Sequence, residues 1–325
     1  MFVEILLLSR IAVSAFGNDA QSLLEIMNEA ANDSSDNSRL KERFLTPYVL
    51  NVFERMDNLD SGNNAQLSGK VRILIPEEDD NQRDNGDEKT LTFNLSEVLH
   101  VNTTAAHLVI SNHLPRTTVQ IHYRNIRIEA DYTSLGLVAD VTEFIGGTSE
   151  TIILKVFIQN LRNVQIDPVL AVFENFSPSQ VSNLEMSRKT QKRRKRSEKQ
   201  GSPIEEYSRT LNSTFDPNIC GLKSWIVEFK VLGWNNWLWA PKSYEANICY
   251  GICPTPFGND YYNASQHAII KNYFHIATGF NHTSIPRACC TPIEYDRITI
   301  IYLSKDRVMV VKSLPMVRAT KCGCR

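Results

Sequence analysis

The chain has 325 residues, enough for about two domains, and a formal net charge of −1 at pH 7. With 42% hydrophobic and 22% charged residues, its composition is that of an ordinary globular protein. No apolar run in this sequence reaches the roughly 18–20 residues that a membrane-spanning helix needs, so the sequence predicts no such helix.

The first 17 residues, MFVEILLLSRIAVSAFG, predict a possible signal peptide. Val13-Ser14-Ala15 resembles a small-residue cleavage pattern, although Glu4 stands where a base is usual and Arg10 interrupts the apolar stretch. The alternative is a start placed too far downstream, which would truncate the leader. On the first interpretation the protein is secreted and extracellular.

Residues 18–176 are expected to form an α+β domain with N-terminal helices followed by an antiparallel β-sandwich. Apolar residues recur at helical spacing in 21–30 and again in 45–58, where Pro47 suits a first helical turn. Strand-like segments then alternate with polar or glycine-containing breaks. These segments are KVRILIP, LTFNL, AHLVIS, TVQIHYR, GLVADVTEFI and ETIILKVFIQ.

Residues 177–196 are polar and read as an exposed linker, because they contain few large apolar groups to bury. The linker ends in the basic run Arg193, Arg194, Lys195 and Arg196, followed by Ser197. This run resembles the site of furin-like proprotein convertases, and the alternative is a nucleic-acid or heparin patch. We interpret it as a cleavage site between Arg196 and Ser197 and expect no nucleic-acid partner.

All seven cysteines lie in the C-terminal third, and the first 219 residues have none. An odd number cannot pair completely within one chain, so an intermolecular bond or a free thiol is expected. Such density indicates an oxidising compartment or a metal site. Because seven thiols without a nearby histidine pair suit structural zinc poorly, we expect no metal and no other cofactor.

Several ordered stretches of this region resemble the seven-cysteine cystine-knot growth factors of the transforming growth factor beta superfamily. The similarity is closest to the bone morphogenetic protein and growth/differentiation factor branch, and it covers Cys220–Arg325. Upstream, PYVLNVF and VADVTEFI look like pieces of the prodomain of that family. The C-terminal stretches are GWNNWLWAP, CYGICP, HAII, PRACCTP, IIYL and the terminal CGCR.

The resemblance implies that 197–325 is a mature growth factor with its cystine knot in 220–325. The mature domain would be small, disulfide-rich and mostly β, with two antiparallel finger hairpins and one wrist helix near 264–277. The implied disulfides are Cys220–Cys290, Cys249–Cys322 and Cys253–Cys324, with Cys289 left for an interchain bond. With this pairing, two backbone segments of five and three residues close a ring of eight, and Gly251 leaves room for a threading disulfide.

The same resemblance implies receptor-binding surfaces on both sides of the fingers. The type I receptor surface would comprise Trp234, Trp237, Phe257, Ile270 and Phe274, and the type II receptor surface Thr299, Ile301, Leu303 and Val311. The two tryptophans are almost as easily explained as buried core, and the apolar stripe of the wrist helix could pack within the chain or against a second copy. Two thin hairpins cannot bury both of their apolar faces alone, so we expect those faces to meet a partner.

Sequons for N-glycosylation occur at Asn32, Asn94, Asn102, Asn212, Asn263 and Asn281. A seventh, at Asn175, is the least favoured because Pro178 follows it.

The sequence gives no support for catalysis, because His267 and His275 lie eight apart on one helix without a triad-like partner. The hypothesis is a secreted growth factor, a homodimer or heterodimer that brings together type I and type II serine/threonine-kinase receptors to activate Smad signalling. Its other partners would be its own prodomain and a proprotein convertase. The alternatives are a secreted cystine-knot antagonist of such ligands and a nodal- or activin-like ligand of the same fold.

Overall fold

The structure is a computed structural model that describes residues 18–30, 38–58, 69–77, 88–98, 101–110, 119–145, 150–158, 166–185, 219–255, 257, 261–281 and 284–325. The chain divides into two compact units. One comprises Met1–Ser187, Glu228–Ser243 and Ile298–Pro315, and the other Arg188–Val227, Tyr244–Arg297 and Met316–Arg325. The first unit therefore combines residues from both sides of the expected cleavage site. None of the helices in the described ranges is both long and apolar enough to span a membrane.

Three helices open the first unit: α2 (Asn18–Glu29), α3 (Ser38–Phe44) and α4 (Pro47–Asn58). The backbone N–H of Val49 donates to the Thr46 hydroxyl at 3.3 Å, which satisfies one of the free donors at the start of α4. Buried residues follow along one face of α4 at helical spacing, so this helix packs its apolar stripe against a sheet. They are Tyr48, Val49, Val52 and Met56.

An eight-stranded sheet and a four-stranded sheet carry most of the remaining residues of this unit. Every strand pair with a described register is antiparallel, as expected for this region. The large sheet has the order β12 (Leu238–Ala240), β15 (Cys290–Leu303), β16 (Met309–Cys324), β1 (Lys70–Leu74), β9 (Pro168–Glu174), β3 (Thr103–Ile110), β7 (Gly136–Asp140) and β6 (Asp131–Thr133). The small sheet has the order β2 (Glu88–Asn94), β8 (Thr151–Ile158), β4 (Val119–Tyr123) and β5 (Ile126–Glu129).

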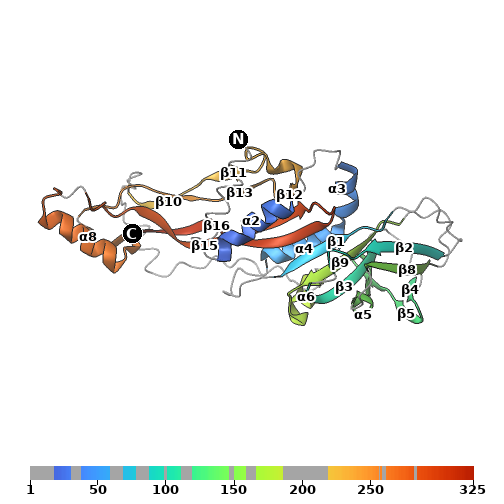
Figure 1. Cartoon of the computed structure of the whole chain (residues 1–325). Coiled ribbons are helices and arrows are strands. Elements are labelled where there is room, and N and C mark those ends of the chain that lie inside the picture. Colours follow the sequence, from blue (N-terminus) through green and yellow to red (C-terminus); the bar gives the residue numbers. More distant parts are fainter. Residues whose placement is uncertain are drawn as a thin grey trace. The chain divides into compact units, whose positions relative to one another are not determined.

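Strand β1 joins the N-terminal region to the C-terminal fingers. One of its edges pairs with β16 from Lys70↔Lys312 to Ile73↔Met309, and its other edge pairs with β9. Figure 1 shows β1 beside the long red strands β15 and β16. The edge of the second finger is therefore closed by backbone hydrogen bonds to a segment that precedes the expected cleavage site.

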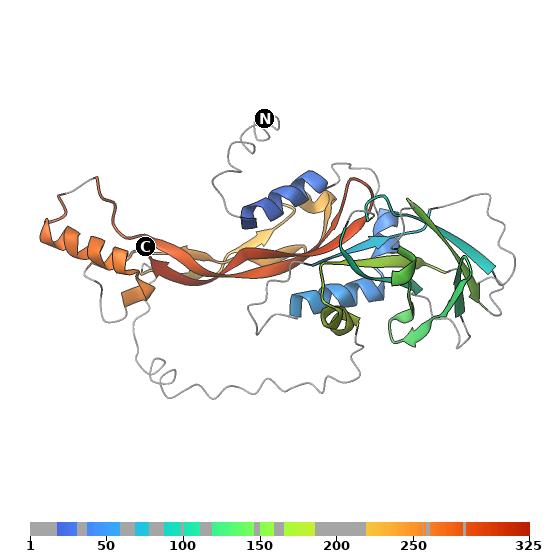
Figure 2. The same cartoon turned by 60° about the horizontal axis from the view of Figure 1, so that its bottom comes forward.

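One apolar core is shared by the helices, the N-terminal strands and the finger strands. Figures 1 and 2 show α2 and α4 on opposite sides of the paired strands β15 and β16. The core has contributions from α4, from β1 and β9, and from the finger positions Trp239, Ile301, Leu303, Met309 and Val311. Removing this much apolar surface from water is the main force that holds the unit together.

A buried group of charges lies where β9 and β1 meet. Glu174 is 1% exposed and forms a hydrogen-bonded ion pair with Arg72, which is 7% exposed. Lys70 Nζ lies 3.6 Å from the second carboxylate oxygen of Glu174, and Glu97 lies 3.8 Å from the Arg72 guanidinium. Each buried charge therefore has a partner, which is the condition for tolerating such a group in an interior.

The second unit contains short hairpins and one long helix. Strand β10 (Gly221–Lys223) pairs with β14 (Ile248–Tyr250), and β11 (Ile226–Glu228) pairs with β13 (Ser243–Glu245). The short helices are η2 (Trp234–Asn236), which belongs to the first unit, and η3 (Tyr261–Asn263). The wrist helix is α8 (Gln266–Ala277), whose start agrees with the expected one to within two residues.

Three expectations about the N-terminal region are wrong in detail. The sequence analysis missed β9, whose seven residues are all buried, and the short strands β5 and β6. The segment GLVADVTEFI is not one strand but β7 followed by the short helix α5 (Thr142–Ile145). The linker does not begin at residue 177, because Pro178–Glu185 forms helix α6, which buries Val181 and Leu184 in the shared core.

Replacing Glu174 by Gln should destabilise the first unit by about 3–5 kcal/mol, because the buried Arg72 would lose its hydrogen-bonded carboxylate and keep only the more exposed Glu97 at 3.8 Å. The measurement is denaturant unfolding of the full chain. The matched control is Glu88→Gln, which breaks the more exposed pair with Lys155 at 2.8 Å and should cost less than about 1 kcal/mol. Equal losses in the two variants would contradict the assigned role of the buried group.

Candidate functional site: the disulfide cluster and the finger surfaces

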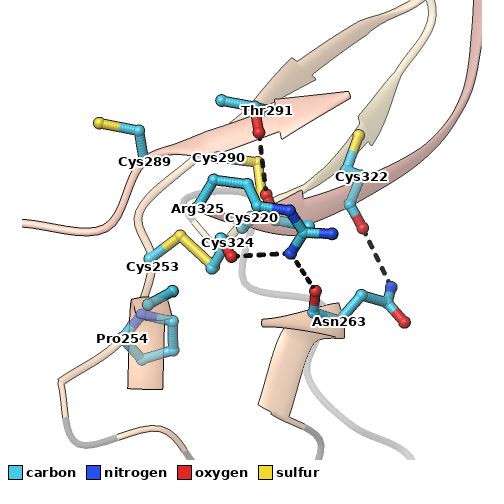
Figure 3. The surroundings of a disulfide bond; sticks show 12 residues. Cys220, Cys253, Pro254, Asn263, Cys289, Cys290, Thr291, Cys322, Cys324 and Arg325 are labelled. Carbon is cyan, nitrogen blue, oxygen red and sulfur yellow. Dashed lines mark hydrogen bonds between the residues drawn. A yellow bond between two sulfur atoms is a disulfide. The ribbon is translucent and has the colours of Figure 1, made fainter. Parts of the chain in front are cut away.

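Three disulfides form a compact cluster in the second unit. They join Cys220 to Cys290, Cys249 to Cys322 and Cys253 to Cys324, the same pairs that the sequence analysis expected. Their Cα–Cα separations are 5.4, 5.6 and 6.0 Å, within the range of ordinary disulfides. Figure 3 shows this cluster with the free Cys289 at its edge.

The two glycines of the ring lie where a side chain would not fit. Gly251 has a φ of 116°, a conformation that favours glycine. A Cβ on Gly323 would lie 2.8 Å from the backbone oxygen of Asn263. One ring segment is also paired with the two segments that carry the threading disulfide, since Ile252 bridges Ile219 on one side and Cys289 on the other. The knot therefore has both covalent and hydrogen-bonded links.

The knot sulfurs are close enough together to resemble a metal cluster. Those of Cys220, Cys253 and Cys324 all lie within 4.8 Å of one another. Each of the three is bonded to another sulfur, and metal ligation requires a thiolate. The disulfides themselves therefore explain why these sulfurs lie so close together.

Cys289 is the one cysteine outside the three disulfides, and it is exposed. In Figure 3 its sulfur points away from the bonded cysteines. Its backbone exchanges two hydrogen bonds with Arg325, of 2.8 and 2.9 Å. An accessible thiol on a firmly held backbone can react with a partner outside the chain.

The wrist helix buries polar residues and exposes apolar ones. Ser265 caps its N-terminus by accepting from the Ala268 N–H at 3.1 Å. The buried Asn272 donates to the Pro254 carbonyl at 3.0 Å and holds the chain that leaves the knot. Ile270 and Tyr273 are 68% and 64% exposed, so the expected apolar stripe is not packed within the chain at these two positions.

The residues expected at the type I receptor surface differ in accessibility. Trp237 is buried and packs edge-on against Tyr302, whereas Trp234 is half-buried and stacks on Phe229. Phe257 and Phe274 are half-buried, and Ile270 is exposed. In this single chain Trp237 is covered and Ile270 is open, whereas the other three residues of the expected surface are half-buried.

All four residues expected at the type II receptor surface are buried in the first unit. Thr299, Ile301, Leu303 and Val311 are between 0% and 2% exposed. The last three belong to the core shared with α4, and the backbone N–H of Thr299 donates to the Asp57 carboxylate of that helix at 3.2 Å. In this chain these residues are therefore core positions, not surface positions.

The opposite face of the second finger is held by the end of α2. The Tyr302 hydroxyl donates to the Glu29 carboxylate at 2.8 Å, and the Lys305 N–H donates to the Glu29 carbonyl at 2.8 Å. Burial, followed by the negative charge of Glu29, raises the pKa of Tyr302 far above its usual value, so this phenol stays a donor at physiological pH. Sequence patterns gave no signal for Glu29 or Asp57, because both contacts join residues more than 240 positions apart.

A second aromatic contact joins α3 to the first finger. Phe44 is fully buried, and its ring centroid lies 6.0 Å from that of Trp239. Tilted aromatic pairs at such separations add to the effect of burial. Phe44 was missed by the sequence analysis, although its apolar character just before Pro47 was a signal that could have been used.

Four of the expected sequons lie on described residues and are exposed: Asn94, Asn102, Asn263 and Asn281. Asn263 donates from its side-chain amide to the Cys322 carbonyl at 3.0 Å. Asn102 donates to the Asn175 side chain at 3.3 Å, so the least favoured sequon lies beside a favoured one.

Several other expectations fall outside the described residues. They are the possible signal peptide of 1–17, the cleavage site Arg193, Arg194, Lys195, Arg196 and Ser197, and the sequons at Asn32 and Asn212.

Taken together, the three-disulfide cluster, the spare thiol and the flat β-hairpins define a knotted ligand domain attached to a larger N-terminal domain. The family model of the transforming growth factor beta like domain matches residues 219–324. This match includes every cysteine of the cluster.

Similar proteins occur in distant animals. "Protein dbl-1" of Caenorhabditis elegans is 35% identical over 114 residues, which cover 35% of this chain and 30% of that protein. "Protein decapentaplegic" of Drosophila melanogaster is 33% identical over 106 residues, covering 33% of this chain and 17% of that protein. "Bone morphogenetic protein 4" of Mus musculus is 37% identical over 106 residues, covering 33% of this chain and 25% of that protein. The matched region is thus less than a third of the length of each of these relatives.

Residues 219–324 therefore resemble the transforming growth factor beta superfamily, and the relatives matched over this region include a bone morphogenetic protein. Ligands of this superfamily are signalling growth factors and not enzymes. The expectation of a non-enzymatic protein therefore rests on the family.

Proposed function

We propose that the chain is the precursor of a secreted growth factor that is cleaved after Arg196 and acts as a dimer linked through Cys289. The observation that carries this proposal is a fully paired six-cysteine cluster beside one exposed thiol. An unpaired, accessible cysteine in an otherwise disulfide-bonded domain is suited to a bond with a second copy. The knot then leaves the thiol at its edge free for this bond.

The dimer signals by bringing receptors together and does no chemistry itself. Two copies present each surface twice, so they recruit two type I and two type II serine/threonine-kinase receptors. Because the receptors are confined to a membrane, binding one raises the effective concentration of the next, and modest individual contacts suffice. Smad phosphorylation inside the cell follows from this proximity.

The N-terminal domain controls when the receptor surfaces become available. Thr299, Ile301, Leu303 and Val311 are all buried against this domain, which supports its role as a cover. Receptor binding and binding of this cover use the same residues and are therefore mutually exclusive at each finger.

Two alternatives share the fold. A secreted antagonist would bind such ligands instead of receptors, and it generally lacks a long cysteine-free N-terminal region ending in a basic cleavage site. A nodal- or activin-like ligand would differ only in the receptors and the Smad class that it engages. Both are distinguished by the signalling assay below.

Purified mature dimer applied to responsive cells should increase phosphorylation of the Smads used by bone morphogenetic proteins. The reason is that the C-terminal domain matches that branch. The measurement is immunodetection of phosphorylated Smads. Phosphorylation of the activin class instead would favour the nodal-like alternative, whereas no signal together with inhibition of another ligand would favour the antagonist.

Replacing Cys289 by Ser should convert the covalent dimer into a monomer on a non-reducing gel, because this thiol is the only one left for an interchain bond. The three intrachain disulfides should remain, as a disulfide map by mass spectrometry would establish. Reduced wild-type protein is the control for the monomer position. A dimer band that survives the substitution would reject the interchain assignment.

After cleavage, the N-terminal domain should stay bound to the mature domain, because the two share one apolar core. Phe44→Ala should weaken this complex, since removing a buried aromatic side chain costs about 3–5 kcal/mol. The measurement is co-purification of the mature part with a tagged N-terminal part. Leu50→Ala, at an exposed position of α4, is the control and should retain the complex. Complete separation of the wild-type parts on cleavage would contradict the prediction.

A further inference from the structure

Arg325 directly follows strand β16, and its backbone exchanges two hydrogen bonds with that of the free cysteine, Cys289. The Cys289 N–H donates to the Arg325 carbonyl at 2.8 Å, and the Arg325 N–H donates to the Cys289 carbonyl at 2.9 Å. This exchange of two hydrogen bonds is the closely spaced pair of an antiparallel ladder. It fixes the backbone of Cys289 on one side, while the bridge to Ile252 fixes it on the other.

The side chain of Arg325 attaches this pair to the short helix η3, which precedes the wrist helix. Its guanidinium donates to the Asn263 carbonyl at 2.6 Å and to the Cys324 carbonyl at 3.0 Å. Figure 3 shows the guanidinium between these two oxygens. The Asn263 side-chain amide donates to the Cys322 carbonyl at 3.0 Å, so hydrogen bonds in both directions join η3 to the end of β16 and Arg325.

The thiol itself is also oriented. Its sulfur lies 3.6 Å from the Arg287 carbonyl, to which it donates weakly. The Arg287 guanidinium lies 4.6 Å from the centroid of the Phe280 ring, which in turn stacks on the buried His275 of the wrist helix. The segment that carries Cys289 is thus connected to both ends of α8, and its sulfur remains exposed.

We propose that Arg325 is a positioning residue for the interchain disulfide, and this inference rests on the proposed function. Disulfide geometry is narrow, with Cα–Cα separations of about 4.4–6.8 Å, so a bond between two chains requires both Cys289 backbones to be held in place. Arg325 supplies this constraint twice, through the backbone pair and through the guanidinium clamp. A long side chain that ends in a donor matters here, because a short side chain such as that of alanine cannot reach the Asn263 carbonyl from the same backbone position.

The chemical step is the oxidation of two Cys289 thiols to one disulfide. Two S–H bonds break, one S–S bond forms, and two protons and two electrons leave. A disulfide oxidant, such as glutathione disulfide, accepts them and becomes two thiols. One Cys289 first forms a mixed disulfide with this oxidant, and the thiolate of the other copy then displaces the leaving thiol.

The test compares secreted full-length chains that carry Arg325→Ala, Arg325→Lys or Arg318→Ala. Arg318 is the matched control, because it also donates to a backbone carbonyl, that of Glu245 at 3.0 Å, from β16, the strand that Arg325 directly follows. Arg325→Ala should lower the fraction of disulfide-linked dimer by about threefold to tenfold, the effect of losing hydrogen bonds from a charged donor. Arg325→Lys should restore much of it, and Arg318→Ala should match the wild type.

Two further readouts separate positioning from a general structural role. The intrachain disulfide map and the thermal unfolding temperature should be the same in Arg325→Ala and wild type. The dimer fraction is measured on non-reducing gels after oxidation with glutathione disulfide. If Arg325→Ala is not secreted, Arg325→Met, which keeps much of the unbranched apolar stem but removes the donors, decides by the same readouts.

A dimer fraction in Arg325→Ala equal to that of the wild type would overturn the inference. So would a scrambled intrachain map, because Arg325 would then serve the knot and not Cys289. Cys289→Ser distinguishes this failure from failure of the proposed function. If Cys289→Ser is monomeric while Arg325→Ala dimerises normally, only the inference about Arg325 is wrong, whereas a dimeric Cys289→Ser would remove the basis of both.

Discussion

A hairpin of two strands is a single layer with two faces and no interior. This constraint determines how the apolar residues of the first unit are packed. In the second finger, Ile301 and Leu303 face one way and Ile300 and Tyr302 the other, and all four are buried. Such a hairpin cannot bury apolar residues on both faces by itself. Helix α4 covers one face, the end of α2 contacts the other, and β1 closes the edge of β16. Strands β15 and β16 of the second finger thereby become inner strands of the eight-stranded sheet.

The second unit also lacks a large apolar core, and disulfide bonds stabilise it instead. Its hairpins are too short for a large core, and three disulfides within a few residues of one another replace it. The wrist helix gains little from burial, because it keeps Ile270 and Tyr273 exposed. Apolar residues left open on a disulfide-stabilised scaffold are suited to contact with another molecule. The two units therefore differ in the apolar surface that a partner can reach. The finger residues of the first unit are buried, whereas the wrist helix of the second unit exposes Ile270 and Tyr273.

The sequence predicted what depends on local pattern and on cysteine spacing. The wrist helix, the disulfide pairs and most N-terminal strands follow from periodicity or from the resemblance to a known family. Strand β9 was missed because its continuous apolar run lacks the alternation used to recognise strands, since both of its faces are buried. The burial of Thr299 and Val311 could not be derived, because it depends on helix α4 more than 240 positions away along the chain. Long-range packing of this kind leaves no trace in local composition.

The same burial explains why a receptor surface can be strongly apolar without causing aggregation. Ile301, Leu303 and Val311 would form an exposed apolar patch on an isolated finger, and such patches associate unselectively in water. Under the proposed function, their apolar surface is already used for packing in the precursor, so a receptor would gain access only by replacing the N-terminal domain. Under the proposed function, the free energy that binds the cover is thus subtracted from the affinity for the receptor. An N-terminal domain that binds more tightly therefore lowers the signalling activity of the ligand. The contacts of Glu29 and Asp57 contribute to this binding at the second finger, and the contact of Phe44 contributes at the first.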